Sequence, residues 1–267
     1  MQKKLMEYLV CPDDLHALEL LDPEFDSGEI RTGTLSCPRC AARYPVVNFI
    51  PRFVGKENYA EIFGFQWKTF RTAQIDSGGY SGSLETFRKK TGFSEESVRG
   101  KRVLDVGVGA GRYADLVSRW GGEVVGIDLS TAVEAARTNL EGRPNAHLVQ
   151  ADLFRLPFRE ESFDIVYSIG VLHHTPNTES AFHAISRYLK TGGTIAIWVY
   201  DRWNWSRRRS LSALASVRKV TTKLSPDTLY YLTSLAIVLY YIYKIPFVRS
   251  LQRYLPISKN SNWKRRW

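Results

Sequence analysis

The strongest constraint on the fold is an alternation of short apolar runs and amphipathic segments between residues 101 and 200. Five runs have the length and apolar character of buried strands: Arg102–Val106, Glu123–Ile127, His147–Gln150, Phe163–Ser168 and Thr194–Tyr200. Helical patterns lie between them at Arg112–Trp120, Thr131–Leu140 and Thr178–Leu189. Strands and helices that alternate in this way form βαβ units. The sequence therefore predicts an α/β fold around a parallel sheet.

The positive charge of the chain is confined to its last quarter. The net charge is +10, but residues 1–200 hold 23 Lys and Arg against 25 Asp and Glu, whereas residues 201–267 hold 14 against 2. This asymmetry suggests an anionic partner for the last quarter, such as membrane lipid, nucleic acid or an anionic substrate. The three cysteines are an odd number, and the N-terminus has no pattern of a secretory signal. Both observations favour a reducing, cytoplasmic compartment.

A glycine-rich loop follows the first strand of the alternating region. Gly107, Gly109 and Gly111 stand at every second position and a helix begins next. Glycine allows a tight turn and the close approach of a ligand to the backbone. Asp128 closes the next strand and can accept both hydroxyls of a ribose. The G-x-G-x-G spacing differs from the G-x-G-x-x-G of nicotinamide dinucleotide sites, which we consider the main alternative.

Further polar residues follow the later strands. Asp152 comes after the third strand and can accept a hydrogen bond from an adenine amino group. Ser168 ends the fourth strand, and the pair His173 and His174 follows it. These residues all lie where open α/β sheets bind ligands, at the carboxyl ends of the strands.

Three motifs carry a resemblance to a known family. Asp105 to Gly111 reads D-x-G-x-G-x-G, Pro157 to Asp164 reads P-F-x-x-x-S-F-D, and Leu189 to Gly193 is similar to L-K-P-G-G with Thr191 in place of proline. In these motifs the core resembles the class I S-adenosylmethionine-dependent methyltransferases of the type 11 group. The resemblance implies a Rossmann-like sheet and S-adenosylmethionine as cofactor. The cofactor-binding residues it implies are Asp105, Gly107, Gly109, Gly111, Asp128, Leu129, Asp152, Leu153 and Ser168.

His173 and His174 are the candidate catalytic bases. A base is needed only where the acceptor is a weakly acidic hydroxyl or amine. The alternative is structural, with one ring capping the next helix and the other packed under the cofactor.

Residues 1–54 form a candidate zinc-ribbon-like, β-rich module. Cys11 and Asp14 have C-x-x-D spacing, and Cys37 and Cys40 have C-x-x-C spacing, as in the paired knuckles of zinc ribbons. The segment resembles the small zinc-ribbon proteins that activate tRNA methyltransferases, with Asp14 where a fourth cysteine usually stands. His16 is a possible substitute ligand, and a metal-free ribbon is the alternative. We expect the module to be structural and dispensable for cofactor binding.

Residues 55–100 are interpreted as a helical cap or linker before the core, which spans residues 101–200. Trp67 and Tyr80 are the candidate contacts of this segment with the cofactor or the acceptor. Simple packing of an amphipathic helix is the alternative.

Residues 201–267 are expected to form a basic and apolar helical extension. Residues 228–243 carry no charge, but these 16 residues are too few to span a bilayer. The segment fits either a lid that is packed on the core or a helix on an anionic membrane surface, with a lipid-like acceptor. Only five strands precede it, whereas the resembling family has seven. A truncated core is therefore left open.

Three functions are consistent with these features. The leading interpretation is methylation of a small-molecule or lipid-linked acceptor. RNA methylation is the enzymatic alternative, because basic and aromatic residues in the last quarter suit RNA. The third is a non-catalytic regulator that binds the cofactor or a partner.

Overall fold

The computed structural model describes residues 1–55, 69, 82–200, 221 and 224–243. The chain divides into two compact units, Met1–Arg202 and Trp203–Trp267. Trp67 and Tyr80 lie outside the described residues, as does most of the basic extension. In the second unit the described part consists mainly of the helix α8 (Pro226–Tyr243).

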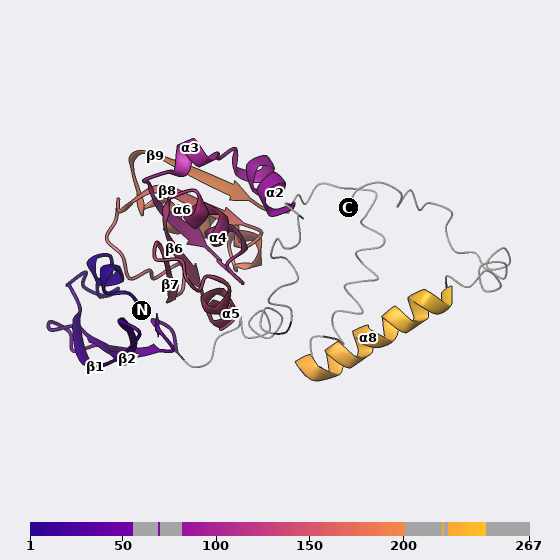
Figure 1. Cartoon of the computed structure of the whole chain (residues 1–267), viewed down its shortest axis with the longest axis horizontal. Helices are drawn as coiled ribbons and strands as arrows, with labels where there is room; N and C mark the ends of the chain where they lie inside the picture. Colours follow the sequence, from indigo (N-terminus) through magenta and orange to yellow (C-terminus); the bar gives the residue numbers. More distant parts are fainter. Residues whose placement is uncertain (56–68, 70–81, 201–220, 222–223, 244–267) are drawn as a thin grey trace. The chain divides into compact units, whose positions relative to one another are not determined.

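The core of the first unit is a five-stranded parallel sheet in the order β7-β6-β5-β8-β9 (Figure 1). Its strands are β5 (Arg102–Val106), β6 (Glu123–Asp128), β7 (Ala146–Gln150), β8 (Phe163–Ile169) and β9 (Leu189–Trp198). The helices around it are α2 (Gly82–Thr91), α3 (Glu95–Val98), α4 (Arg112–Arg119), α5 (Ala132–Asn139) and α6 (Thr178–Ser186), with a short 3-10 helix η2 (Leu172–His174). The predicted α/β architecture is confirmed.

One boundary in the sheet was predicted wrongly. The helical pattern expected to run through Leu189 ends at Ser186, and Leu189 already pairs with Phe163 in the sheet. A register shift then brings Thr194 beside Ile165. Residues 190–193, between these two pairs, are polar or glycine. This part of the strand therefore lacks the apolar residues that indicate a strand in the sequence.

Side chains of the sheet alternate between two apolar clusters. Leu104 and Val106 of β5 belong to the cluster that includes α6, whereas Val103 belongs to the cluster beneath α2, α4 and α5. This alternation buries both faces of the strands, as parallel sheets require.

The N-terminal module is a four-stranded antiparallel sheet in the order β1-β2-β3-β4. Its elements are a 3-10 helix η1 (Lys3–Glu7), then β1 (Glu19–Asp26), β2 (Glu29–Ser36), β3 (Arg43–Val47) and β4 (Ile50–Pro51). The β1–β2 hairpin turns at Ser27 and Gly28, which both have positive φ angles. Sequence reasoning missed this hairpin because β1 is charged and largely exposed, so its burial pattern does not alternate.

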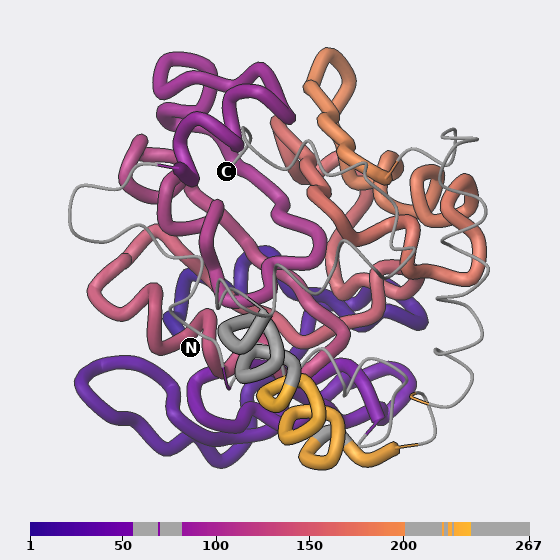
Figure 2. The backbone as a smooth tube through the Cα atoms, turned by 90° about the vertical axis from the view of Figure 1, so that its right-hand side faces the viewer, coloured from indigo at the N-terminus to yellow at the C-terminus, as the bar shows by residue number. Residues whose placement is uncertain are grey.

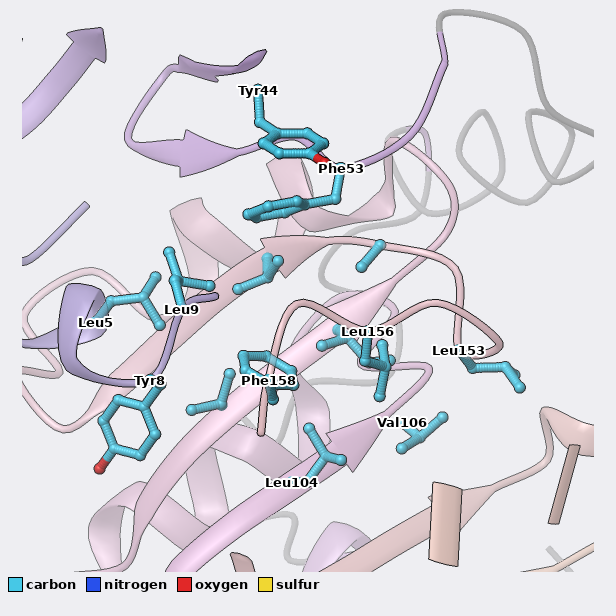
Figure 3. Packing of buried hydrophobic residues seen from close by; sticks show 14 of the residues in the cluster. Leu5, Tyr8, Leu9, Tyr44, Phe53, Leu104, Val106, Leu153, Leu156 and Phe158 are labelled. Atoms are coloured by element: carbon cyan, nitrogen blue, oxygen red, sulfur yellow. The ribbon is translucent and has the colours of Figure 1, made fainter. Parts of the chain in front are cut away.

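The module and the core share one apolar cluster. Leu5, Leu9 and Phe53 from the module pack with Leu104 and Phe158 from the core (Figure 3). The backbone N–H of Val10 also donates to the carbonyl of Pro157 at 2.9 Å. In Figure 2 the indigo module lies mainly below the magenta and pink tube of the core. It therefore covers one face of the sheet as an integral part of the first unit.

Candidate nucleoside and metal sites

The glycine loop between β5 and α4 is built on left-handed backbone. Gly107, Gly109 and Gly111 have φ angles of +86°, +53° and +84°. A Cβ at Gly107 would lie 2.2 Å from a methyl carbon of Val171, so no side chain fits there without displacing the loop after β8. The glycines are thus required by backbone conformation and, at Gly107, also by close packing.

Asp128 at the end of β6 is hydrogen-bonded both to the glycine loop and to the loop that follows β6. One of its carboxylate oxygens accepts the N–H of Gly109 at 3.0 Å, and the other accepts the N–H and the hydroxyl of Ser130 at 2.9 and 2.7 Å. Burial raises the pKa of this carboxyl group despite these hydrogen bonds. The residue is partly exposed, so its carboxylate can be reached by a ligand at this edge.

Asp152 lies just beyond the end of β7, the neighbour of β6. One carboxylate oxygen accepts the N–H of Phe154 at 3.0 Å. Leu153 beside it is buried, and Leu129 follows Asp128 in the neighbouring loop. The backbone N–H of Ala151 donates to the carbonyl of Asp128 at 3.1 Å, which holds the two strand ends together. Carboxylates next to leucines suit a nucleoside, with a polar sugar and a flat, largely apolar base.

Asp105 and Ser168 turn toward the protein instead. The Asp105 carboxyl group is buried, accepts the hydroxyl hydrogen of Tyr167 at 2.7 Å, and has its pKa raised to about 7 by burial. The hydroxyl of Ser168 is fully buried and donates to the carbonyl of Val106 at 2.9 Å. Both side chains therefore support the strands beneath the glycine loop.

His173 and His174 lie together in η2, at the carboxyl edge of β8. Their ring centroids are 4.1 Å apart, and the ring of His173 is 4.3 Å from that of Tyr200. Both ring nitrogens of His173 are buried without a hydrogen-bond partner among the described residues. Burial, with a smaller effect of His174, lowers the pKa of His173. Its imidazole is therefore neutral at pH 7 and can accept a proton.

The module brings together the four residues that the C-x-x-D and C-x-x-C spacings indicate. The ligand atoms of Cys11, Asp14, Cys37 and Cys40 all lie within 4.8 Å of one another. The Sγ atoms of Cys11 and Cys40 are 3.6 Å apart, and Cys37 Sγ lies 3.3 and 3.4 Å from the Asp14 oxygens. Tetrahedral zinc with usual bond lengths would separate such atoms by roughly 3.6–3.8 Å. The donor set therefore fits zinc.

His16 stands outside this group of four. Its backbone N–H donates to Asp14 at 3.1 Å, and this hydrogen bond lowers the pKa of the Asp14 carboxyl group. The carboxylate is thereby oriented and kept ionised, as a metal ligand must be.

Two family models match the chain. Residues 104–197 match the model described as a methyltransferase domain, and residues 2–48 match that of a Trm112p-like protein. Residues 104–197 are thus similar to a methyltransferase domain. The matched residues contain the strand ends described above, from the glycine loop to the two histidines.

Curated methyltransferases are similar to part of this chain. The chain is 32% identical over 158 residues to phosphoethanolamine N-methyltransferase 2 of Caenorhabditis elegans, which covers 56% of this chain and 35% of that protein. It is 34% identical over 109 residues to the ubiquinone biosynthesis O-methyltransferase of Hydrogenovibrio crunogenus, and the match covers 39% of this chain and 43% of that protein. It is 32% identical over 120 residues to probable tRNA methyltransferase 9B of Mus musculus, and this match covers 43% of this chain and 25% of that protein. The chain thus spans less than half the length of these relatives.

Sequence reasoning missed three polar residues beneath the candidate nucleoside site: Arg52, Gln150 and Tyr167. Tyr167 could have been suspected, because its position in an otherwise apolar strand requires a buried partner for its hydroxyl. Arg52 and Gln150 carry no motif, and their pairing spans 98 residues of sequence. Only the folded chain brings them together.

Proposed function

We propose that this protein is an S-adenosylmethionine-dependent methyltransferase that acts on a small-molecule or lipid-linked acceptor. The observation that carries the proposal is the carboxyl edge of the sheet within the methyltransferase domain. There a loop of three left-handed glycines is hydrogen-bonded to Asp128, and a second carboxylate, Asp152, follows the adjacent strand.

The side chains at this edge fit S-adenosylmethionine. Asp128 would accept the ribose hydroxyls, Asp152 would accept the adenine amino group, and Leu129 and Leu153 would contact the base. The cofactor, when bound, supplies a methyl group that its sulfonium already activates. The protein then contributes mainly by binding and orienting the two reactants.

The names of two relatives support the acceptor class. One is a phosphoethanolamine methyltransferase and the other belongs to ubiquinone biosynthesis. A second candidate function is RNA methylation, which is favoured by the similarity to a probable tRNA methyltransferase and by the Trm112p-like match of residues 2–48. Labelled S-adenosylmethionine, incubated with the protein and with separate lipid, small-molecule and RNA fractions, distinguishes the two.

A structural zinc ion in the N-terminal module forms part of the same proposal. Cys11, Asp14, Cys37 and Cys40 would hold it, and it would stabilise the two knuckles of the ribbon without contact with the reacting groups.

The cofactor assignment is tested by calorimetry with S-adenosylhomocysteine and the variant Asp128→Ala. The variant loses hydrogen bonds between a carboxylate and the ribose, so we expect binding to weaken by about 2–3 kcal/mol. Asp164→Ala is the matched control, because Asp164 is a β8 carboxylate that bonds Lys190 and the N–H of Arg102 at the amino edge of the same sheet. Equal affinity of Asp128→Ala and the wild type would contradict the assignment.

His173 is the favoured base for an acceptor that must lose a proton. Its lowered pKa keeps the ring unprotonated below the usual histidine range, so kcat/KM should fall with acid only at pH values below the ordinary histidine pKa. With an acceptor from the fractionation in hand, His173→Asn should lower kcat at least tenfold, while His174→Asn serves as its neighbour control. An unchanged pH profile in His173→Asn would show that His173 is not the base and serves only in packing.

A further inference from the structure

Arg52 is a charged residue buried where the N-terminal module meets the methyltransferase core. It is only 9% exposed. Its guanidinium donates to the side-chain oxygen of Gln150 at 2.9 Å and to the carbonyl of Val47 at 3.3 Å, and it forms an ion pair with Glu134. A buried charge is tolerated only with such partners. Two of these partners, Gln150 and Glu134, belong to the core.

Gln150 links Arg52 to the loop of residues 129–131 between β6 and α5, which we call the nucleoside loop. Its side chain is buried, and its Nε2 donates to the carbonyl of Leu129 at 3.0 Å. The guanidinium has only donors, so the amide oxygen must face Arg52 and the amide nitrogen must face Leu129. The N–H of Phe53 also donates to the Gln150 carbonyl at 2.8 Å, which fixes the backbone of the same residue.

Glu134 holds the other end of the same loop. Leu129 lies between β6, which ends at Asp128, and α5, and Glu134 lies in the first turn of α5. One guanidinium therefore holds this loop twice, through Gln150 on β7 and through Glu134 on α5.

We propose that Arg52 is a positioning residue of the nucleoside site: through Gln150 and Glu134 it fixes the loop that presents Asp128 and Leu129 to the adenosine part of the cofactor. This inference rests on the proposed function. The N-terminal module thus contributes to cofactor affinity through one side chain that touches no ligand.

Gln150→Glu separates this role from simple stabilisation of the interface. A glutamate still accepts from Arg52, and the pair becomes ionic, but no donor remains for the Leu129 carbonyl. We expect at least tenfold weaker binding of S-adenosylhomocysteine and a higher KM for S-adenosylmethionine with kcat little changed, whereas a purely structural role would lower only the melting temperature. Arg52→Met should weaken binding to a similar extent.

Arg137→Met is the matched control. Arg137 also lies on α5 and pairs with Glu29 of the module at 2.7 Å, but none of its described contacts leads to Leu129. It should lower the melting temperature and leave the affinity within about twofold of wild type. If the wild type binds S-adenosylhomocysteine and Gln150→Glu binds equally well, the positioning role is overturned while the proposed function stands. If the full-length wild type fails to bind it at all, the proposed function fails, and the inference fails with it.

Discussion

Asp105 shows how one residue of a glycine-loop motif can serve the fold beneath the ligand. Its carboxyl group is buried against the Tyr167 hydroxyl, and burial raises its pKa to about 7 from an ordinary value of 3.8. The folded protein therefore holds a proton here that the unfolded chain releases between those values. Stability from this group is complete below about pH 4 and is lost as pH rises toward 7.

The variant Asp105→Asn tests this linkage at the scale of one residue. Asparagine keeps the shape and the oxygen that accepts from Tyr167, but it cannot ionise. The free energy of unfolding should therefore depend less on pH between about 4 and 7, by up to about 1.4 kcal/mol per pH unit. Urea unfolding across this range measures the slope, and parallel curves for the two proteins would rule the effect out.

At the scale of elements, the two knuckles of the N-terminal module depend on the four-residue cluster. A bound zinc ion would connect the separate loops of this module that carry the four residues. We expect the purified protein to contain about one zinc per chain and chelation to lower its melting temperature.

Asp14→Ala should abolish stoichiometric zinc, as measured by elemental analysis. Asp13→Asn is the neighbour control, because Asp13 bonds Arg155 and Tyr44 and is not one of the four clustered ligands. Retention of zinc in Asp14→Ala would show that the aspartate is no ligand.

The helix α8 is the main described element of the second unit. Within the described residues no helix is long and apolar enough to cross a bilayer. Tyr231 and Leu235 of α8 are 72% and 56% exposed. Contact of this region with an anionic membrane surface stays a prediction, as does a cytoplasmic location.

For the whole molecule, the shared cluster changes one expectation from the sequence. The module was expected to be dispensable for cofactor binding, but its Leu5, Leu9 and Phe53 cover apolar residues of the sheet. Removal of residues 1–54 would expose this face to water, which costs roughly 25 cal/mol of folding free energy for each Å² of apolar surface exposed.

The deletion should therefore yield a protein that binds a hydrophobic dye and unfolds at a lower temperature, with loss of S-adenosylhomocysteine binding. Dye fluorescence and calorimetry on the deletion and the full chain measure both effects. A deletion that stays folded and binds with wild-type affinity would restore the picture of two independent parts.

The sequence by itself determined the parallel sheet, the glycine loop with Asp128, and the cysteine knuckles. These features depend on local patterns, namely the period of apolar residues, glycines where φ is positive, and ligands at short spacing. The tertiary structure alone decided that the module and the core share one hydrophobic cluster, that Asp105 and Ser168 face inward, and that Arg52 is linked to the nucleoside loop through Gln150. Such contacts join residues far apart in the chain, and their partners are chosen by packing and by the cost of burying unpaired polar groups, which no local pattern records.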